Sequence, residues 1–133
     1  MIRQRRGASA VEFVLTLPVL FGIFAAIMEY GWFLLEYNSV IQAVRDGTRL
    51  GVATPMDNDP TDTALDRTQT ILLGFGIECD TDDGCDLEAA IDTTGSLDIL
   101  TVTILLEYDP LIGFIPTPEA FSSTFTMAME EQS

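Results

Sequence analysis

The chain has 133 residues, 21 of them acidic and six of them arginines, with no lysine, no histidine and a formal net charge of −15. This length accommodates one membrane segment and one small domain, and so acidic a surface argues strongly against nucleic-acid binding. Only carboxylates and hydroxyls are left to carry catalysis, and no two of them form a recognisable pair. We therefore expect no enzyme, no cofactor and no catalytic residue.

A long apolar segment follows the basic N-terminus. No charged residue occurs from Phe13 to Met28, and the apolar run continues to Leu35 with one interruption, at Glu29. About 20 such residues suffice to cross a bilayer as a helix. Basic flanks stay in the cytoplasm, so the arginines before residue 7 predict a single-pass protein of the inner (cytoplasmic) membrane. Its N-terminus would be cytoplasmic and its acidic remainder periplasmic or extracellular.

Two glutamates border this apolar run. Glu12 lies at the start of the apolar run, where burying a carboxylate in the membrane costs free energy unless an opposite charge neutralises it. Counting about 20 residues at about 1.5 Å each from Ala8 brings the chain to Glu29, beside Tyr30 and Trp32, which suit an interfacial aromatic belt. Glu29 is therefore predicted to be interfacial rather than a buried ion-pair partner. A cleaved secretory signal is less consistent with the sequence, because no small-x-small cleavage site follows the run.

Residues 8–53 are predicted to form one long helix, which Pro55 ends. Beyond the membrane, small and β-branched residues recur at spacings of three and four, namely Val40, Val44, Gly47 and Gly51. This face either anchors a solvated helix to its own domain or packs against neighbouring subunits.

Residues 54–133 are predicted to form a small acidic domain that begins with a second helix. Asp59 and Pro60 are typical of an N-cap and a first helical position. The helix would run from about residue 61 to 73 and bury Leu65, Leu72 and Phe75.

Cys79 and Cys85 enclose a short acidic loop. In an exported domain a disulfide can persist, and closing this loop contributes about 2.4 kcal/mol in the chain-entropy model. The aspartates of segment 80–83 suggest calcium, but the spacing fails the EF-hand pattern and no glutamate follows Gly84 at the required distance. A solvated loop without metal is favoured.

The remainder is predicted to form about three antiparallel strands, which gives an α+β fold. The predicted inward-facing positions of the last two strands alternate along the chain and are mostly apolar: Leu100, Val102, Ile104, Leu106 and Tyr108, then Phe121, Ser123, Phe125, Met127 and Met129. The first strand, around Leu87 to Ile91, has a composition that also suits a helix. The apolar loop 109–119 is predicted to fold back on the domain, because so small a domain needs its apolar residues; a contact patch is the alternative.

The junction at residues 7–13, Gly-Ala-Ser-Ala-Val-Glu-Phe, resembles the processing site of type IV pilins and pseudopilins. In those proteins a membrane-embedded aspartic peptidase cuts after the glycine, here Gly7. A glutamate occupies the fifth position of the mature chain, which is Glu12 when Ala8 is the first. The wider runs RGASAVEFVLTLPVL and AVRDGTRLGVA are most similar to TadE-type pseudopilins of the tight-adherence (Tad) pilus system. The resemblance covers residues 6–53.

This resemblance implies a leader peptide (residues 1–7), a transmembrane and stem helix (8–53) and an extracytoplasmic domain (54–133). It implies a minor pilin of a Tad-type type IV pilus with a role in adhesion. A prepilin peptidase, other pilin or pseudopilin subunits, the Tad assembly platform and membrane lipid would be its partners. Glu12 and Phe13 would act in subunit assembly, with Glu12 pairing with the new α-amino group of Ala8 in a neighbour.

Two other functions stay open at this point. One is an unprocessed single-pass membrane protein whose acidic exported domain binds cations or a partner. The other is a minor pseudopilin of a related secretion system.

Overall fold

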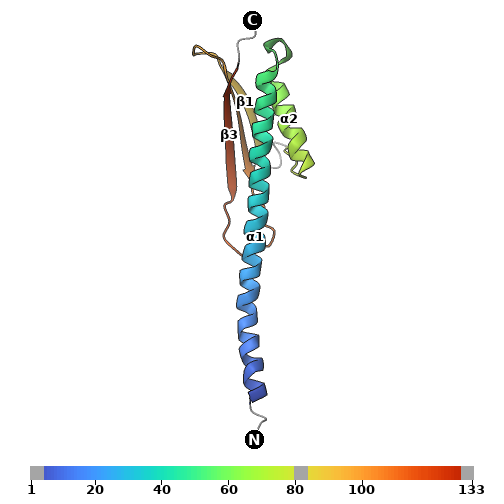
Figure 1. Ribbon diagram of the computed structural model, residues 1–133, viewed down its shortest axis with the longest axis vertical. Helices are drawn as coiled ribbons and strands as arrows, with labels where there is room; N and C mark the ends of the chain where they lie inside the picture. Colours follow the sequence, from blue (N-terminus) through green and yellow to red (C-terminus); the bar gives the residue numbers. More distant parts are fainter. Residues whose placement is uncertain (1–4, 80–83, 130–133) are drawn as a thin grey trace. The chain divides into compact units, whose positions relative to one another are not determined.

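The structure is a computed structural model that describes residues 5–79 and 84–129, with side chains from residue 10 onward. Its elements are, in chain order, α1 (Arg5–Ala53), the short 3₁₀ helix η1 (Met56–Asn58), α2 (Pro60–Gly74), β1 (Cys85–Asp92), β2 (Ile99–Glu107) and β3 (Ala120–Ala128) (Figure 1). The predicted α+β fold, with one long helix, a second helix and three antiparallel strands, is confirmed.

The chain folds as two compact units. The first comprises Met1–Leu34 and the loop segment Pro110–Thr117, and the second comprises Leu35–Asp109 and Pro118–Ser133. Helix α1 contributes to both units. The loop therefore belongs with the N-terminal part of α1, although the 75 residues Leu35–Asp109 separate the two in the sequence.

Helix α1 is a continuous helix of 49 residues with Pro18 in its interior. It is long and apolar enough to cross a membrane, and it is the only described helix that is. From Val11 to Leu35 most of its large apolar side chains are exposed, Phe13, Leu20 and Phe24 by 60% or more. Apolar side chains so exposed indicate a surface that an apolar environment covers.

The second unit has an ordinary inward-facing core. Its sheet has the order β1-β2-β3, with Leu87 opposite Ile104 and Val102 opposite Phe125. The residues of β2 that were expected to face inward, Leu100, Val102, Ile104 and Leu106, are all buried, as is Tyr108 directly after the strand. On the other face, threonine hydroxyls pair across β2 and β3, at 3.2 Å for both Thr101–Thr126 and Thr103–Thr124. Segment 85–92, ambiguous by sequence, is a strand.

The C-terminal part of α1 packs against its own domain. Of the two functions expected for the face that carries Val40, Val44, Gly47 and Gly51, anchoring the domain or packing against neighbouring subunits, the structure shows the first. Val40, Val44, Gly47 and Gly51 are buried. The two glycines allow this close approach, because a Cβ on Gly47 would collide with Thr68 and one on Gly51 would lie 2.6 Å from Leu100 Cδ2. In Figure 1, α2 and the sheet lie alongside this half of α1.

Helix α2 begins as predicted but buries a different face. Asp59, in a left-handed conformation with φ of 50°, accepts a hydrogen bond from the Asp62 N–H, and Pro60 is the first helical residue. The buried residues are Pro60, Ala64, Thr68 and Leu72. The prediction was wrong for Phe75, which is 51% exposed, and Leu65 is only half-buried. Small residues face α1 here because Gly47 and Gly51 bring the helices too close together for larger ones.

Candidate functional site

The predicted processing and assembly residues lie in the first turns of α1. The helix begins at Arg5, so the Gly7–Ala8 bond lies within helical backbone. Glu12 and Phe13 are exposed on the helix surface, and no side chain among the described residues bonds to the Glu12 carboxylate. Nothing in the folded monomer therefore satisfies this carboxylate within the part of the chain that has described side chains.

The predicted disulfide between Cys79 and Cys85 is present, with a Cα–Cα distance of 5.1 Å. It joins the segment after α2 to the first residue of β1, and the Gln69 side chain donates a hydrogen bond to the Cys79 carbonyl at 3.2 Å. The acidic segment 80–83, where calcium was considered, lies outside the described residues. Among the residues that are described, no cluster of three possible metal ligands occurs.

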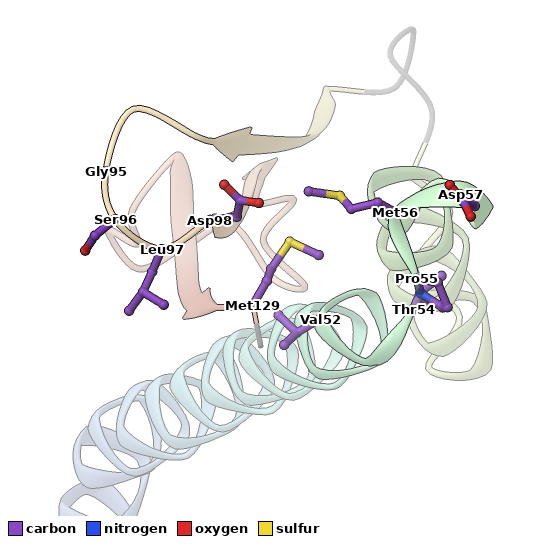
Figure 2. A pocket seen from close by; sticks show the side chains of 10 residues that line it. All are labelled: Val52, Thr54, Pro55, Met56, Asp57, Gly95, Ser96, Leu97, Asp98 and Met129. Atoms are coloured by element: carbon purple, nitrogen blue, oxygen red, sulfur yellow. The ribbon is translucent and has the colours of Figure 1, made fainter. Parts of the chain in front are cut away.

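Surface hollows occur in several places on the second unit. Figure 2 shows one of about 420 Å³ near the end of α1, where the side chains of Met56 and Met129 project inward and Asp98 contributes a carboxylate. A second hollow, of about 360 Å³, is lined by all three arginines that follow residue 37, namely Arg45, Arg49 and Arg67, together with Gln42, Asp46, Ile71 and Phe75. Neither hollow combines a nucleophile with a base in a catalytic arrangement.

Two of the three arginines of this second hollow, Arg45 and Arg67, have partners within the fold. Arg67 donates to the Asp46 carboxylate at 3.0 Å, an exposed pair that contributes little to stability. The Arg45 guanidinium lies 5.2 Å from the centre of the Phe125 ring, within the range of a cation–π contact. These contacts connect α1 to α2 and to β3 within the second unit.

The most specific polar arrangement centres on Glu29 and was not predicted. This side chain is fully buried, and its two carboxylate oxygens accept hydrogen bonds from consecutive backbone N–H groups, Leu111 at 2.9 Å and Ile112 at 2.8 Å. In the next position of α1 the Tyr30 hydroxyl donates to the Pro116 carbonyl at 3.1 Å. Hydrogen bonds to an ionised acceptor are stronger than neutral ones. Helix α1 therefore holds the loop Pro110–Thr117 at both ends.

The loop was predicted to fold back on the acidic domain, and that prediction was wrong. The loop instead packs with the apolar part of α1 in the first unit, and it leaves Leu111 53%, Ile112 46% and Phe114 81% exposed. Hence these three side chains add nothing to a core. A glutamate inside an apolar run was the available signal, but a local pattern does not reveal that its partners are amides more than 80 residues away.

Comparison with family models finds one match, to the family described as TadE-like protein, over residues 7–49. The match begins at the glycine of the predicted processing site and ends four residues before the end of α1. Over this segment, about a third of its length, the chain is similar to that family. No curated protein matches the chain significantly, and no solved structure does.

Proposed function

From its TadE-like N-terminal segment, we propose that this protein is a minor pilin or pseudopilin in the assembly of a Tad-type type IV pilus. The observation that carries the proposal is the family match over residues 7–49, which includes both the glycine and the glutamate of a pilin-type junction. We further propose that a prepilin peptidase cuts after Gly7, and that the protein acts in surface attachment through other pilin subunits and the Tad assembly platform.

The structure supports this proposal through what it leaves exposed. Helix α1 is compatible with a single-pass membrane protein, and its exposed apolar side chains suit transfer from lipid to the apolar surfaces of neighbouring helices. Orientation follows from the arginines at the N-terminus, which would keep that end cytoplasmic.

Glu12 is the residue that we assign to assembly. After cleavage Ala8 would carry a free α-amino group, and a carboxylate in a low-dielectric helix bundle needs an opposite charge at hydrogen-bonding distance. Because the described side chains of its own chain do not bond to Glu12, the amino terminus of a neighbouring subunit is a suitable partner. Phe13, exposed beside it, would pack in the same contact.

Mass spectrometry of the N-terminus of protein from the native membrane tests the processing step. We expect a mature chain that begins at Ala8, and an intact Met1 would support the alternative of an unprocessed membrane protein with an acidic exported domain.

Glu12→Gln tests the assembly role. It should leave membrane insertion and the disulfide intact but reduce the number of pili, whereas Glu78→Gln, at an exposed carboxylate of the second unit, should not. Normal piliation in the Glu12 variant would refute the pairing.

A further inference from the structure

The loop Pro110–Thr117 combines exposed apolar side chains with a firm attachment to α1. It contains no charged residue, while Asp109 and Glu119 lie just outside its two ends and are exposed. The rest of the chain beyond residue 37 carries the whole net charge of −15. An uncharged, apolar, exposed loop in so acidic a chain marks an interaction surface.

We propose that this loop inserts into the interfacial layer of the lipid bilayer, on the side of the membrane where the acidic domain lies. The proposal requires α1 to span the membrane, but it requires neither processing nor pilus assembly. The occupant of the surface is lipid, because the loop forms one compact unit with the apolar part of α1 and because its attachment points lie at the depth of an interface.

The depth follows from the geometry of an α-helix. At a rise of about 1.5 Å per residue, the 22 residues from Ala8 to Glu29 span roughly 30 Å, the thickness of a hydrocarbon core. Glu29 and Tyr30 therefore lie near the boundary between acyl chains and headgroups, as does Trp32 two residues on. Tyrosine and tryptophan favour this layer, and the loop is bound to α1 at this level.

The hydrogen-bonding state of the loop lowers the cost of removing it from water. Of its eight residues, Pro110 and Pro116 have no N–H, and the N–H groups of Leu111 and Ile112 bind Glu29. Four of the eight loop residues therefore have no unsatisfied backbone N–H group. The remaining donors need water or headgroup oxygens, so the loop belongs in the interfacial layer and not in the hydrocarbon core.

The same contacts explain how a carboxylate can remain buried at this depth. A charged side chain at the membrane is costly unless it is satisfied, and two backbone N–H groups satisfy both oxygens of Glu29. Gly113, with a φ of 68°, turns the loop between Ile112 and Phe114. Phe114 is left as its most exposed large apolar side chain.

Quenching of tryptophan fluorescence by brominated lipids tests this proposal in the full chain. Trp32→Phe removes the only tryptophan, and a single tryptophan is then introduced by Phe114→Trp in the loop. Two matched probes use Phe24→Trp in the apolar part of α1 and Leu97→Trp, at a 53% exposed position between β1 and β2. Each protein is reconstituted in phosphatidylcholine bilayers brominated either close to the headgroup or near the acyl-chain ends.

We expect the Phe114→Trp protein to lose most of its emission to the shallow bromines and less to the deep ones. The Phe24→Trp protein should show the reverse, and the Leu97→Trp protein should lose little to either. If the Phe114→Trp protein is quenched no more strongly than the Leu97→Trp protein, the proposal is overturned. A second result would also overturn it: the loop tryptophan could show blue-shifted emission that is not quenched by bromine and that depends on the protein-to-lipid ratio. That result would mean that a second copy of the chain, and not lipid, covers the loop.

The attachment to Glu29 provides a second test. Glu29→Gln replaces one acceptor oxygen by an amide that donates, so it cannot bind both loop N–H groups. In the Phe114→Trp background it should reduce shallow quenching, whereas Glu78→Gln should not change it. Unchanged quenching in the Glu29 variant would overturn the assignment of Glu29 as the residue that holds the loop at the interface.

Discussion

The two units use apolar residues in opposite ways, although one continuous helix contributes to both. In the first unit, α1 presents side chains such as Leu20 and Phe24 outward, more than half exposed. In the second, the same helix turns Val40 and Val44 inward, fully buried against its own domain. Helical structure is thus common to both units, and the surroundings decide which face of the helix is covered.

The glycines of α1 show the same contrast at the level of single atoms. A Cβ on Gly31 would meet nothing within 4 Å, whereas one on Gly47 would collide with Thr68 and lie 2.7 Å from the carbonyl oxygen of Ala64. In the first unit a glycine leaves space, and in the second it allows two helices to touch. Two predictions test this difference and a third sharpens the picture of the second unit, from the largest expected effect to the smallest.

Leu100→Ala should cause the largest loss of stability. Leu100 is fully buried in β2 beside Gly51, and removing such a side chain costs about 2–5 kcal/mol through lost burial and the cavity left behind. Leu20→Ala is the matched change at a side chain that is 64% exposed, and it should leave the second unit unaffected. Hydrogen exchange of β2 amides in the membrane-reconstituted protein measures both. An equal loss of hydrogen-exchange protection in the Leu100→Ala and Leu20→Ala proteins would contradict the contrast between the units.

Gly47→Ala should have an intermediate effect. Alanine favours a helix by about 1 kcal/mol over glycine, but forcing an extra methyl into a packed contact costs about 1–3 kcal/mol. The Ala64 carbonyl belongs to the backbone of α2 and cannot move aside as a side chain would, so we expect a net destabilisation of the second unit. Gly31→Ala, in open space, is the control and should not destabilise the protein in the same exchange measurement. A more stable Gly47 variant would show that the two helices separate freely.

The smallest effect concerns the start of α2. The Thr61 hydroxyl and the Asp62 N–H donate hydrogen bonds to Asp59 and lower its pKa below the ordinary value. Because the folded pKa is the lower one, the stabilisation is fully present above the unfolded value of about 3.9. It is lost as the pH falls through the folded pKa.

Carboxyl NMR titration of Asp59 measures this shift directly, and its midpoint should lie below that of an unperturbed aspartate. Asp59→Asn keeps a side-chain acceptor and tolerates the left-handed conformation, so it should remove this part of the acid sensitivity while keeping the helix start. A midpoint at the ordinary value would exclude the cap as a source of pH dependence.

Patterns within a single element predicted much of this structure. The alternation in β2 and β3 identified their inward faces because side chains in a strand alternate with a period of two. Asp59-Pro60 marked the start of α2, and the short spacing of Cys79 and Cys85 was consistent with a disulfide. Each of these inferences needs only residues that are close in sequence.

Contacts between distant residues were the ones that such patterns missed. The buried face of α2 depends on how closely α1 approaches, which two glycines of another helix determine. The binding of the loop to Glu29 joins residues 82 and 83 positions apart. Periodicity contains no information about such pairs, so Phe75 was wrongly placed in the core and the loop was wrongly expected to fold back on the acidic domain.

By itself, the sequence determined that this chain has a membrane-length helix behind a segment that resembles a pilin junction, an acidic region with a disulfide, and strands with defined faces. These features follow from local hydrophobicity, charge and turn chemistry. Only the tertiary structure decided that the stem face of α1 packs on its own domain and that Glu29 binds the loop Pro110–Thr117. The reason is physical, since a buried carboxylate must find donors wherever the fold brings them, and here it brings backbone amides from the far end of the chain.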